Sequence, residues 1–235
     1  MNMHHTLITA HSGCEGTPDN SIASVLAGIR AGADCVEIDV HADPGGKLWL
    51  IHDTPSAYAG LASLEEAFAA ILDANVAINC DLKHYEAFAP ALLLAEAMRI
   101  PRELLYFSGS VDVLALAADP SPAKRANILL NTEELCRYLD TSVRGREGEM
   151  ALIDSRLAEV AALVHSLGAA GLNAPYAFFP HERIAAWRAA GLPLSLWTVN
   201  EPEPLTALFT EDLLNITTRT VSSAVRIRSE IERTA

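Results

Sequence analysis

Two carboxylates stand out in the segment 32–53, GADCVEIDVHADPGGKLWLIHD, because they interrupt a run that is otherwise typical of a buried β-strand. Glu37 and Asp39 are two residues apart, so strand alternation places both on one face and their apolar neighbours on the other. A carboxylate that points into a sheet or barrel is costly to desolvate unless a positive charge meets it. The pattern therefore indicates a metal ion or a fixed cation beside this strand.

Two nearby segments add further titratable groups. After a glycine turn, the short apolar run LWLI ends on His52 and an aspartate. The later segment INCDLK repeats the first pattern, because Asn79, Asp81 and Lys83 share one strand face. One imidazole, one more acid and one lysine are thus expected to point the same way as the first two carboxylates.

The elements that must position these residues alternate between strand-length apolar runs and longer helical patterns, which is typical of βα units and a parallel sheet. The eight expected strands are Thr6–Ala10, Cys35–Val40, Val76–Leu82, Leu104–Phe107, Asn127–Leu130, Ala170–Asn173, Leu194–Val199 and Leu213–Thr217. Between them, Ser63 and Glu66 form a capping box, and Asp19 or Asn20 can cap an earlier helix. The order predicts an α/β fold, a (β/α)8 TIM barrel with a small hairpin excursion after strand 2.

Two segments complete the expected fold. The run EMALIDS is compatible with a short strand or with the start of a helix, and residues 222–233 have the pattern of a closing helix. No linker forces a division, so we expect one domain over residues 1–235.

The strand ends of such a barrel meet at one mouth, which would gather the polar residues. His11 follows the first strand, and Trp197 and Asn200 end the seventh. Mg²⁺ and Ca²⁺ prefer oxygen ligands such as three carboxylates, whereas Zn²⁺ more often recruits histidine. We favour one divalent ion of the Mg or Ca kind, which leaves His11 and His52 free for proton transfer.

The amino-acid composition limits which classes of binding partner the protein can have. The 235 residues carry a formal net charge of -13 with a pI near 5.0, which argues against nucleic acid or an anionic membrane surface as a partner. The amino terminus lacks the pattern of a secretory signal, and no apolar run is long enough for membrane insertion, so we expect a cytoplasmic protein. Four scattered cysteines indicate buried thiols in a reducing compartment, and the oligomeric state stays open.

The motifs together resemble those of the glycerophosphodiester phosphodiesterases. The segment AHSGCEGTPDNSIASVLAGIRAGADCVEIDVHADPGGKLWLIHD is similar to the family's opening, with His-Arg-Gly, Pro-Glu-Asn-Thr, Gly-Ala-Asp-x-Ile-Glu-x-Asp-Val and His-Asp. INCDLK resembles its Glu-x-Lys strand, and LPLSLWTVN its Trp-Thr-Val-Asn strand. The likeness covers most of the chain in the same order and is weakest over residues 110–165.

The resemblance implies a barrel hydrolase that cleaves a small phosphodiester to a phosphomonoester of the glycerol 3-phosphate type. It assigns one divalent metal to Glu37, Asp39 and Asp81. It gives acid and base catalysis to two histidines, without saying which is which, and leaves water or a substrate hydroxyl as the nucleophile. The site residues that it implies are the catalytic His11 and His52, the phosphate- or substrate-binding Lys83, Ser12 and Trp197, and the metal ligands Glu37, Asp39 and Asp81.

Departures from the family's motifs concern the substrate more than the reaction. Ser12 replaces the arginine that contacts phosphate, so Lys83 and the metal would carry the anion alone. Asp81 replaces a glutamate, and NITTRTV lacks the aspartate of the Thr-Asp-x-Pro ending. Two alternatives therefore stay open, a barrel that binds a phosphorylated ligand without turnover and a lysophospholipase D-like enzyme, for which Phe178 and Phe179 give a hint.

Overall fold

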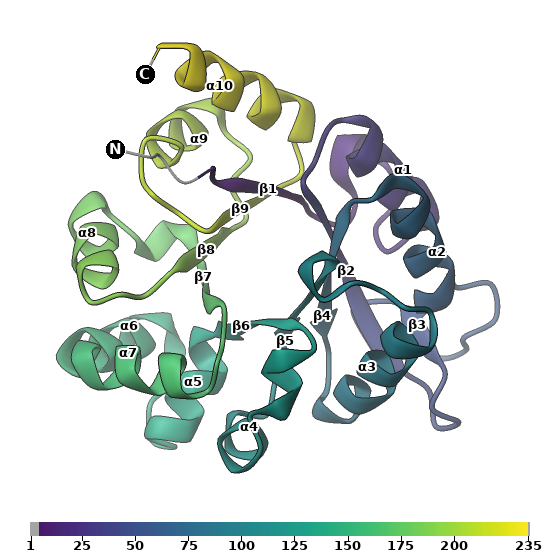
Figure 1. The fold of residues 1–235 in the computed structure, drawn as a ribbon, viewed down its shortest axis with the longest axis horizontal. Coiled ribbons are helices and arrows are strands. Elements are labelled where there is room, and N and C mark those ends of the chain that lie inside the picture. The colour runs from purple at the N-terminus through teal and green to yellow at the C-terminus, as the bar shows by residue number, and fades with distance from the viewer. Residues whose placement is uncertain (1–4, 235) are drawn as a thin grey trace.

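The computed structural model describes residues 5–234, which contain a closed barrel of eight parallel strands surrounded by helices (Figure 1). The barrel strands are β1 (Leu7–Ala10), β2 (Cys35–Ala42), β4 (Ala77–Leu82), β5 (Leu105–Gly109), β6 (Asn127–Asn131), β7 (Gly171–Pro175), β8 (Leu194–Trp197) and β9 (Asn215–Thr218). The barrel closes because β1 pairs with both β2 and β9. The predicted (β/α)8 barrel is confirmed, and each expected strand overlaps an observed one.

The helices lie outside the strands. They are α1 (Ile22–Arg30), α2 (Leu64–Ala74), α3 (Phe88–Ala97), α4 (Val113–Ala118), α5 (Thr132–Leu139), α6 (Gly145–Ser155), α7 (Leu157–Ser166), α8 (His181–Ala189), α9 (Pro202–Leu208) and α10 (Val221–Thr234). The run EMALIDS is the end of α6, and α10 is the expected closing helix. Within residues 5–234, no helix combines the length and apolar character needed to cross a bilayer.

Helix capping explains two of the helix starts. The predicted capping box of α2 is present, with the Ser63 side chain accepting from the backbone N–H of Glu66. At α1 the expectation was wrong, because Ser21 is the N-cap and its hydroxyl accepts from Ser24 N at 3.1 Å. Asn20 instead turns its side chain toward the barrel.

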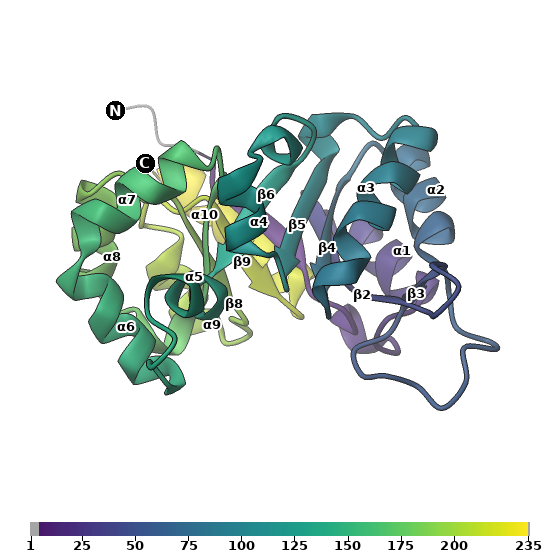
Figure 2. The same cartoon turned by 90° about the horizontal axis from the view of Figure 1, so that it is seen from below.

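The predicted excursion after the second strand is also confirmed. Strand β3 (Leu48–Leu50) pairs antiparallel with β2, with Val40 opposite Leu50. The segment that joins β3 to α2 projects from the barrel (Figure 2). His52 lies at the start of that segment and follows Ile51, whose backbone N–H donates to the Asp39 carbonyl of β2 at 3.1 Å.

Strand alternation separates an apolar outer layer from a polar barrel interior. Ile38 and Val40 on the outer face of β2 are fully buried beneath the helices. Inside, Ser195 Oγ donates to Asn173 Oδ1 at 2.9 Å, and Asn173 Nδ2 donates to Asn131 Oδ1 at 2.9 Å. Because these polar side chains satisfy one another, the interior can stay polar without a large desolvation cost.

Candidate active site

A cavity of about 460 Å³ opens at the carboxyl ends of the barrel strands. Its lining residues are His11, Asp19, Asn20, Glu37, Asp39, His52, Asn79, Asp81, Lys83, Ser108, Asn131, Glu133, Arg146, Asn173, Trp197, Thr217 and Arg219. Seven of the eight catalytic, substrate-binding and metal-binding residues that the resemblance implied are among them, and Ser12 is not. Asn200, which the sequence placed at the mouth, is also absent from the lining. A second cavity, of about 810 Å³, lies at the opposite, amino-terminal ends of the strands, near Leu7, Pro193 and Leu214. Its lining contains none of the residues that the sequence predicted for the site.

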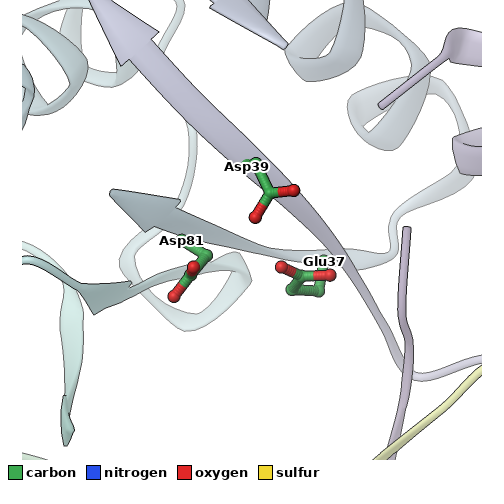
Figure 3. A group of neighbouring side chains, drawn as sticks. All are labelled: Glu37, Asp39 and Asp81. Carbon is green, nitrogen blue, oxygen red and sulfur yellow. The ribbon is translucent and has the colours of Figure 1, made fainter. Parts of the chain in front are cut away.

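Three carboxylates meet on the floor of the cavity and form what we call the acid cluster, Glu37, Asp39 and Asp81 (Figure 3). The first two alternate along β2, and the register of β2 with β4 places Asp39 beside Asp81. One oxygen from each carboxylate lies within 4.8 Å of the others, and Glu37 and Asp39 are buried. The sequence prediction that these three residues converge is therefore correct in geometry.

Lys83 partly neutralises the acid cluster. Its Nζ lies 2.6 Å from Asp39 Oδ1 and 2.5 Å from Asp81 Oδ2. Burial disfavours the charged form of Lys83, but the two carboxylates outweigh that cost and raise its pKa. Lys83 is therefore a fixed cation of the site, with two of its three N–H donors used by the cluster.

Glu37 is the most constrained member of the acid cluster. Burial, followed by the negative charges of Asp39 and Asp81, raises the pKa of this carboxyl well above its ordinary value. The backbone N–H of Ser12 donates to Glu37 Oε2 at 3.0 Å and opposes that shift in part. A further positive charge beside Glu37 would remove the penalty on its ionised form.

Asn20 orients Asp39. Its Nδ2 donates to Asp39 Oδ2 at 2.8 Å, and its Oδ1 accepts from the backbone N–H of Asp39 at 3.0 Å. The backbone of Asn20 is left-handed, with φ of +52°, a conformation that asparagine tolerates better than most residues. The sequence suggested Asn20 only as a helix cap, so this role was missed.

Asp81 is oriented by a hydrogen-bonded chain. Ser108 Oγ donates to Asp81 Oδ1 at 2.8 Å and accepts from Asn79 Nδ2 at 2.9 Å. Because Asn79 uses its Nδ2 for the contact with Ser108, its Oδ1 is the amide atom that is left over. That buried oxygen has no hydrogen-bond partner among residues 5–234. Asn79 pairs across the ladder with Glu37, so this unpartnered acceptor adds one more oxygen to the region of the acid cluster.

The charges of the cavity fit a divalent cation. Its lining carries five carboxylates and three lysine or arginine side chains, which leaves two negative charges when all of them are ionised. Carboxylate oxygens with an amide oxygen close by are a donor set that suits Mg²⁺ or Ca²⁺. The residues present therefore fit the ion that the sequence predicted.

His11 follows β1 and faces the cavity. Its Nδ1 lies 2.8 Å from the backbone oxygen of Ser12, so a proton on Nδ1 satisfies that carbonyl and leaves the lone pair on Nε2. Glu37 Oε2 lies 3.8 Å from the same nitrogen. The imidazole is thus held in one tautomer with Nε2 available for proton transfer.

His52 enters the cavity from the segment after β3 and is more exposed, with 66% of its side chain accessible. Its Nδ1 lies 2.8 Å from Asp53 Oδ1, so the carboxylate accepts the Nδ1 proton and again leaves Nε2 free. The two histidines that the sequence singled out therefore border one cavity and share a tautomer.

Trp197 and Arg146 form one wall of the cavity. The guanidinium of Arg146 lies 5.8 Å from the centre of the indole ring. The Trp197 Nε1–H is buried and has no acceptor among the described residues. Arg146 comes from α6, in the part of the sequence where the motifs were weakest, and no sequence signal pointed to it.

Ser12 differs from its expected role. It is 1% exposed and does not line the cavity. Its hydroxyl donates to Asn20 Oδ1 at 3.1 Å and accepts from the backbone N–H of Asn20 at 2.5 Å. Because the hydroxyl is used inside the protein, this geometry argues against Ser12 as a phosphate ligand, and we assign it to the support of Asn20 and Glu37.

Arg219 is a further cavity residue that the sequence did not single out. It follows Asn215 and Thr217 at the alternate positions of β9, the face that points into the barrel. Extending that alternation by one step past the strand would have placed it at the mouth. Asn200, expected as a pocket residue, accepts from the backbone N–H of Arg219 at 2.8 Å instead.

Solved structures supply the comparison with known proteins. No protein-family model matches the sequence. No curated protein matches it either. A glycerophosphodiester phosphodiesterase from Thermotoga maritima aligns with a TM-score of 0.72 and 22% identity, over 96% of this chain and 99% of that one. The fold of the present chain is therefore that of the glycerophosphodiester phosphodiesterases.

Two other structures with this fold show the same agreement. A glycerophosphodiester phosphodiesterase from Parabacteroides distasonis aligns with a TM-score of 0.72 and 16% identity, over 97% of this chain and 98% of that one. A phosphodiesterase from Oleispira antarctica, solved with the product sn-glycerol-3-phosphate, has a TM-score of 0.68 and 20% identity, over 96% of each chain. The fold expected from the sequence resemblance is thereby confirmed over nearly the whole chain.

Proposed function

We propose that this protein is a metal-dependent phosphodiester hydrolase that cleaves a glycerophosphodiester, or a related small diester, to a phosphomonoester and an alcohol. The observation that carries the proposal is the single cavity that brings together the acid cluster, Lys83 and two histidines with free Nε2 atoms. The glycerol phosphate bound in the Oleispira antarctica structure supports a phosphomonoester of that type as the product.

The acid cluster would hold one divalent ion, with Mg²⁺ or Ca²⁺ as the best match to its oxygen donors. When bound, such an ion supplies charge stabilisation to a phosphoryl oxygen. Lys83 keeps Asp39 and Asp81 in place through its two short ion pairs. Its third N–H is free to donate to a phosphate oxygen of the substrate.

His11 and His52 are proposed as the acid and base. One imidazole, neutral with its lone pair on Nε2, accepts the proton of the attacking water or substrate hydroxyl. The other acts as an imidazolium that carries a proton on both nitrogens, and it donates its Nε2 proton to the oxygen of the leaving alcohol. The contacts of each Nδ1, with the Ser12 carbonyl and with Asp53, hold the rings so that only Nε2 exchanges protons with substrate.

Trp197 is proposed to line the substrate pocket. Its ring borders the cavity and offers an apolar face to the glycerol carbons. The lysophospholipid alternative loses its sequence hint, because neither Phe178 nor Phe179 lines the cavity and Phe179 is buried against Trp187.

The test is release of a phosphomonoester from a panel of glycerophosphodiesters, with Mg²⁺, Ca²⁺ or Mn²⁺ and with EDTA. We expect a divalent-ion-dependent activity that falls about 10²-fold or more in His11→Ala and in His52→Ala. His165→Ala, which changes an exposed histidine on α7, is the matched control and should keep full activity. If no diester is turned over with any metal, the hydrolase proposal fails in favour of a binding protein.

A further inference from the structure

Three cationic side chains line the cavity, and two of them are already neutralised. Lys83 is held by two carboxylates of the acid cluster. Arg146 donates to both Glu133 and Glu149. Arg219 is the third cation, and it has fewer carboxylate partners than the other two.

Arg219 pairs with a single carboxylate in the described part of the chain. Its Nη2 lies 3.0 Å from Asp19 Oδ1, and the side chains of the two residues are 43% and 59% exposed. Ion pairs that are this accessible are weak, because water screens them and competes for both partners. Of the three cations, Arg219 therefore has the charge that is most available to an incoming anion.

The Arg219 guanidinium also faces a donor rather than an acceptor. Its Nε lies 3.3 Å from His11 Nδ1, but that nitrogen donates its own proton to the Ser12 carbonyl at 2.8 Å. Two N–H groups cannot satisfy each other, and the shorter contact assigns the Nδ1 proton. The Nε–H of Arg219 is thus left beside the proposed catalytic imidazole without a good acceptor.

The backbone fixes Arg219 at this place. The register pairs Ala10 with Thr218, so His11 and Arg219 are the next residues along neighbouring strands. The Arg219 N–H donates to Asn200 Oδ1 at 2.8 Å, and its carbonyl accepts from Glu15 N at 3.0 Å. The backbone of Arg219 is therefore held in place at the rim of the cavity.

We propose that Arg219 is the phosphate-binding cation of this site, donating two parallel N–H groups to the oxygens of the phosphodiester and of the phosphomonoester product. This inference rests on the proposed function and deepens it. A planar guanidinium suits phosphate better than a lysine does, because two donors meet two oxygens. Ser12 adjoins β1, and Arg219, which belongs to the NITTRTV segment that lacks the family's aspartate, adjoins the paired strand β9. The guanidinium of Arg219 would therefore supply the positive charge that the buried hydroxyl of Ser12 cannot.

Asp19 competes with phosphate in this arrangement. Because the carboxylate is paired with the guanidinium, an incoming phosphate oxygen must share or replace that contact. Removal of the carboxylate charge should therefore leave phosphate affinity unchanged or tighten it. A purely structural Arg219–Asp19 pair predicts the opposite, since loss of either partner would then do equal damage.

The experiment measures binding of sn-glycerol 3-phosphate and of inorganic phosphate by calorimetry with Mg²⁺ present, and the KM of the best diester. Arg219→Gln should raise both dissociation constants and KM about tenfold or more, and Arg219→Lys should give an intermediate loss. Asp19→Asn should bind as tightly as wild type or tighter. The matched control is Arg226→Gln on α10, which breaks an exposed pair of the same 3.0 Å length with Glu230 and should change binding less than about twofold.

Each other outcome is decisive. Unchanged binding and KM in Arg219→Gln, with a wild type that hydrolyses diesters, would overturn the role of Arg219 and leave the proposed function intact. If phosphate binding depends on Arg219 but the wild type turns over no diester, the role of Arg219 would stand and the proposed function would be overturned. Equal losses in Asp19→Asn and Arg219→Gln, or no binding of either probe by wild type, would also overturn the inference. The melting temperature of each variant separates these results from misfolding, and Arg219→Lys keeps the test open if Arg219→Gln does not fold.

Discussion

Asp81 and Lys83 are separated by one residue of the chain, and Lys83 Nζ lies 2.5 Å from Asp81 Oδ2. The same ammonium reaches Asp39 at 2.6 Å on the neighbouring strand. Strand alternation supplies the first contact and the β2–β4 register the second. One lysine thus ties two strands together at the point where the barrel gathers its negative charge.

Lys83→Met should destabilise the metal-free protein by about 3 kcal/mol, because it leaves two partly buried carboxylates without their cation. Saturating Mg²⁺ or Ca²⁺ should restore much of that loss by supplying the missing positive charge. Denaturant unfolding with EDTA and with each ion measures both effects, and Lys124→Met, an exposed change, is the control. A Lys83→Met protein as stable as wild type in EDTA would contradict the charge balance described for the cluster.

Asp81→Asn should remove most of the stabilisation that a divalent ion gives. A ligand at 100 times its dissociation constant stabilises the folded state by about 2.7 kcal/mol, so wild type should melt at a clearly higher temperature with Mg²⁺ or Ca²⁺ than with EDTA. Thermal unfolding with and without each ion is the measurement. Asp73→Asn, an exposed carboxylate change on α2, should respond to the ions as wild type does, and an ion effect that survives in Asp81→Asn would place the metal elsewhere.

Asn20→Ala should weaken metal binding about 10- to 100-fold, because groups that orient a metal ligand typically matter by that factor. The ion is titrated into each protein by calorimetry. Asn75→Ala is a closely matched control, since Asn75 is also an asparagine with a left-handed backbone, φ of +53°, but lies at the end of α2. Equal metal affinity in the two variants would mean that the contacts of Asn20 with Asp39 do not orient the ligand.

The two histidines should respond differently to the leaving group. A diester that releases p-nitrophenol needs no protonation of its leaving oxygen, so the variant that lacks the general acid should recover most of its activity on it. The variant that lacks the base should stay slow on both substrates. Rates of His11→Ala and His52→Ala on a p-nitrophenyl diester and on an alkyl diester assign the roles, and recovery of both variants or of neither would argue against a division into acid and base.

Buried thiols should make stability fall at alkaline pH. Burial raises the pKa of Cys35 and of Cys136 to about 12. The unfolded thiols ionise near pH 8.5, so above that pH the unfolded state is favoured by up to about 1.4 kcal/mol per pH unit for each thiol until the folded pKa is reached. Unfolding under reducing conditions between pH 8 and 10 should show a shallower slope in Cys35→Ala/Cys136→Ala than in wild type. Equal slopes would mean that other groups dominate.

Local patterns determined much of this protein in advance. Alternation in CVEIDV and INCDLK set which carboxylates share a face, and the repeated βα order set the barrel, because both depend on neighbours in the chain. The capping box of Ser63 and Glu66 is equally local and was predicted correctly. The position of the α1 cap was not, because Asn20 is drawn to Asp39 by a contact across the fold that outweighs its preference for a helix end.

Tertiary structure alone decided how charge is distributed over the site. Three features depend on which strands are neighbours and on how deeply each side chain lies. They are the burial of Ser12, the ion pairs of Lys83 with two carboxylates and the exposure of Arg219. Desolvation and Coulomb energies vary with distance and burial, and neither quantity can be taken from residue order. The sequence therefore determined which groups point into the barrel, and the closure of β9 onto β1 placed Arg219, the most exposed of the three cations, beside His11.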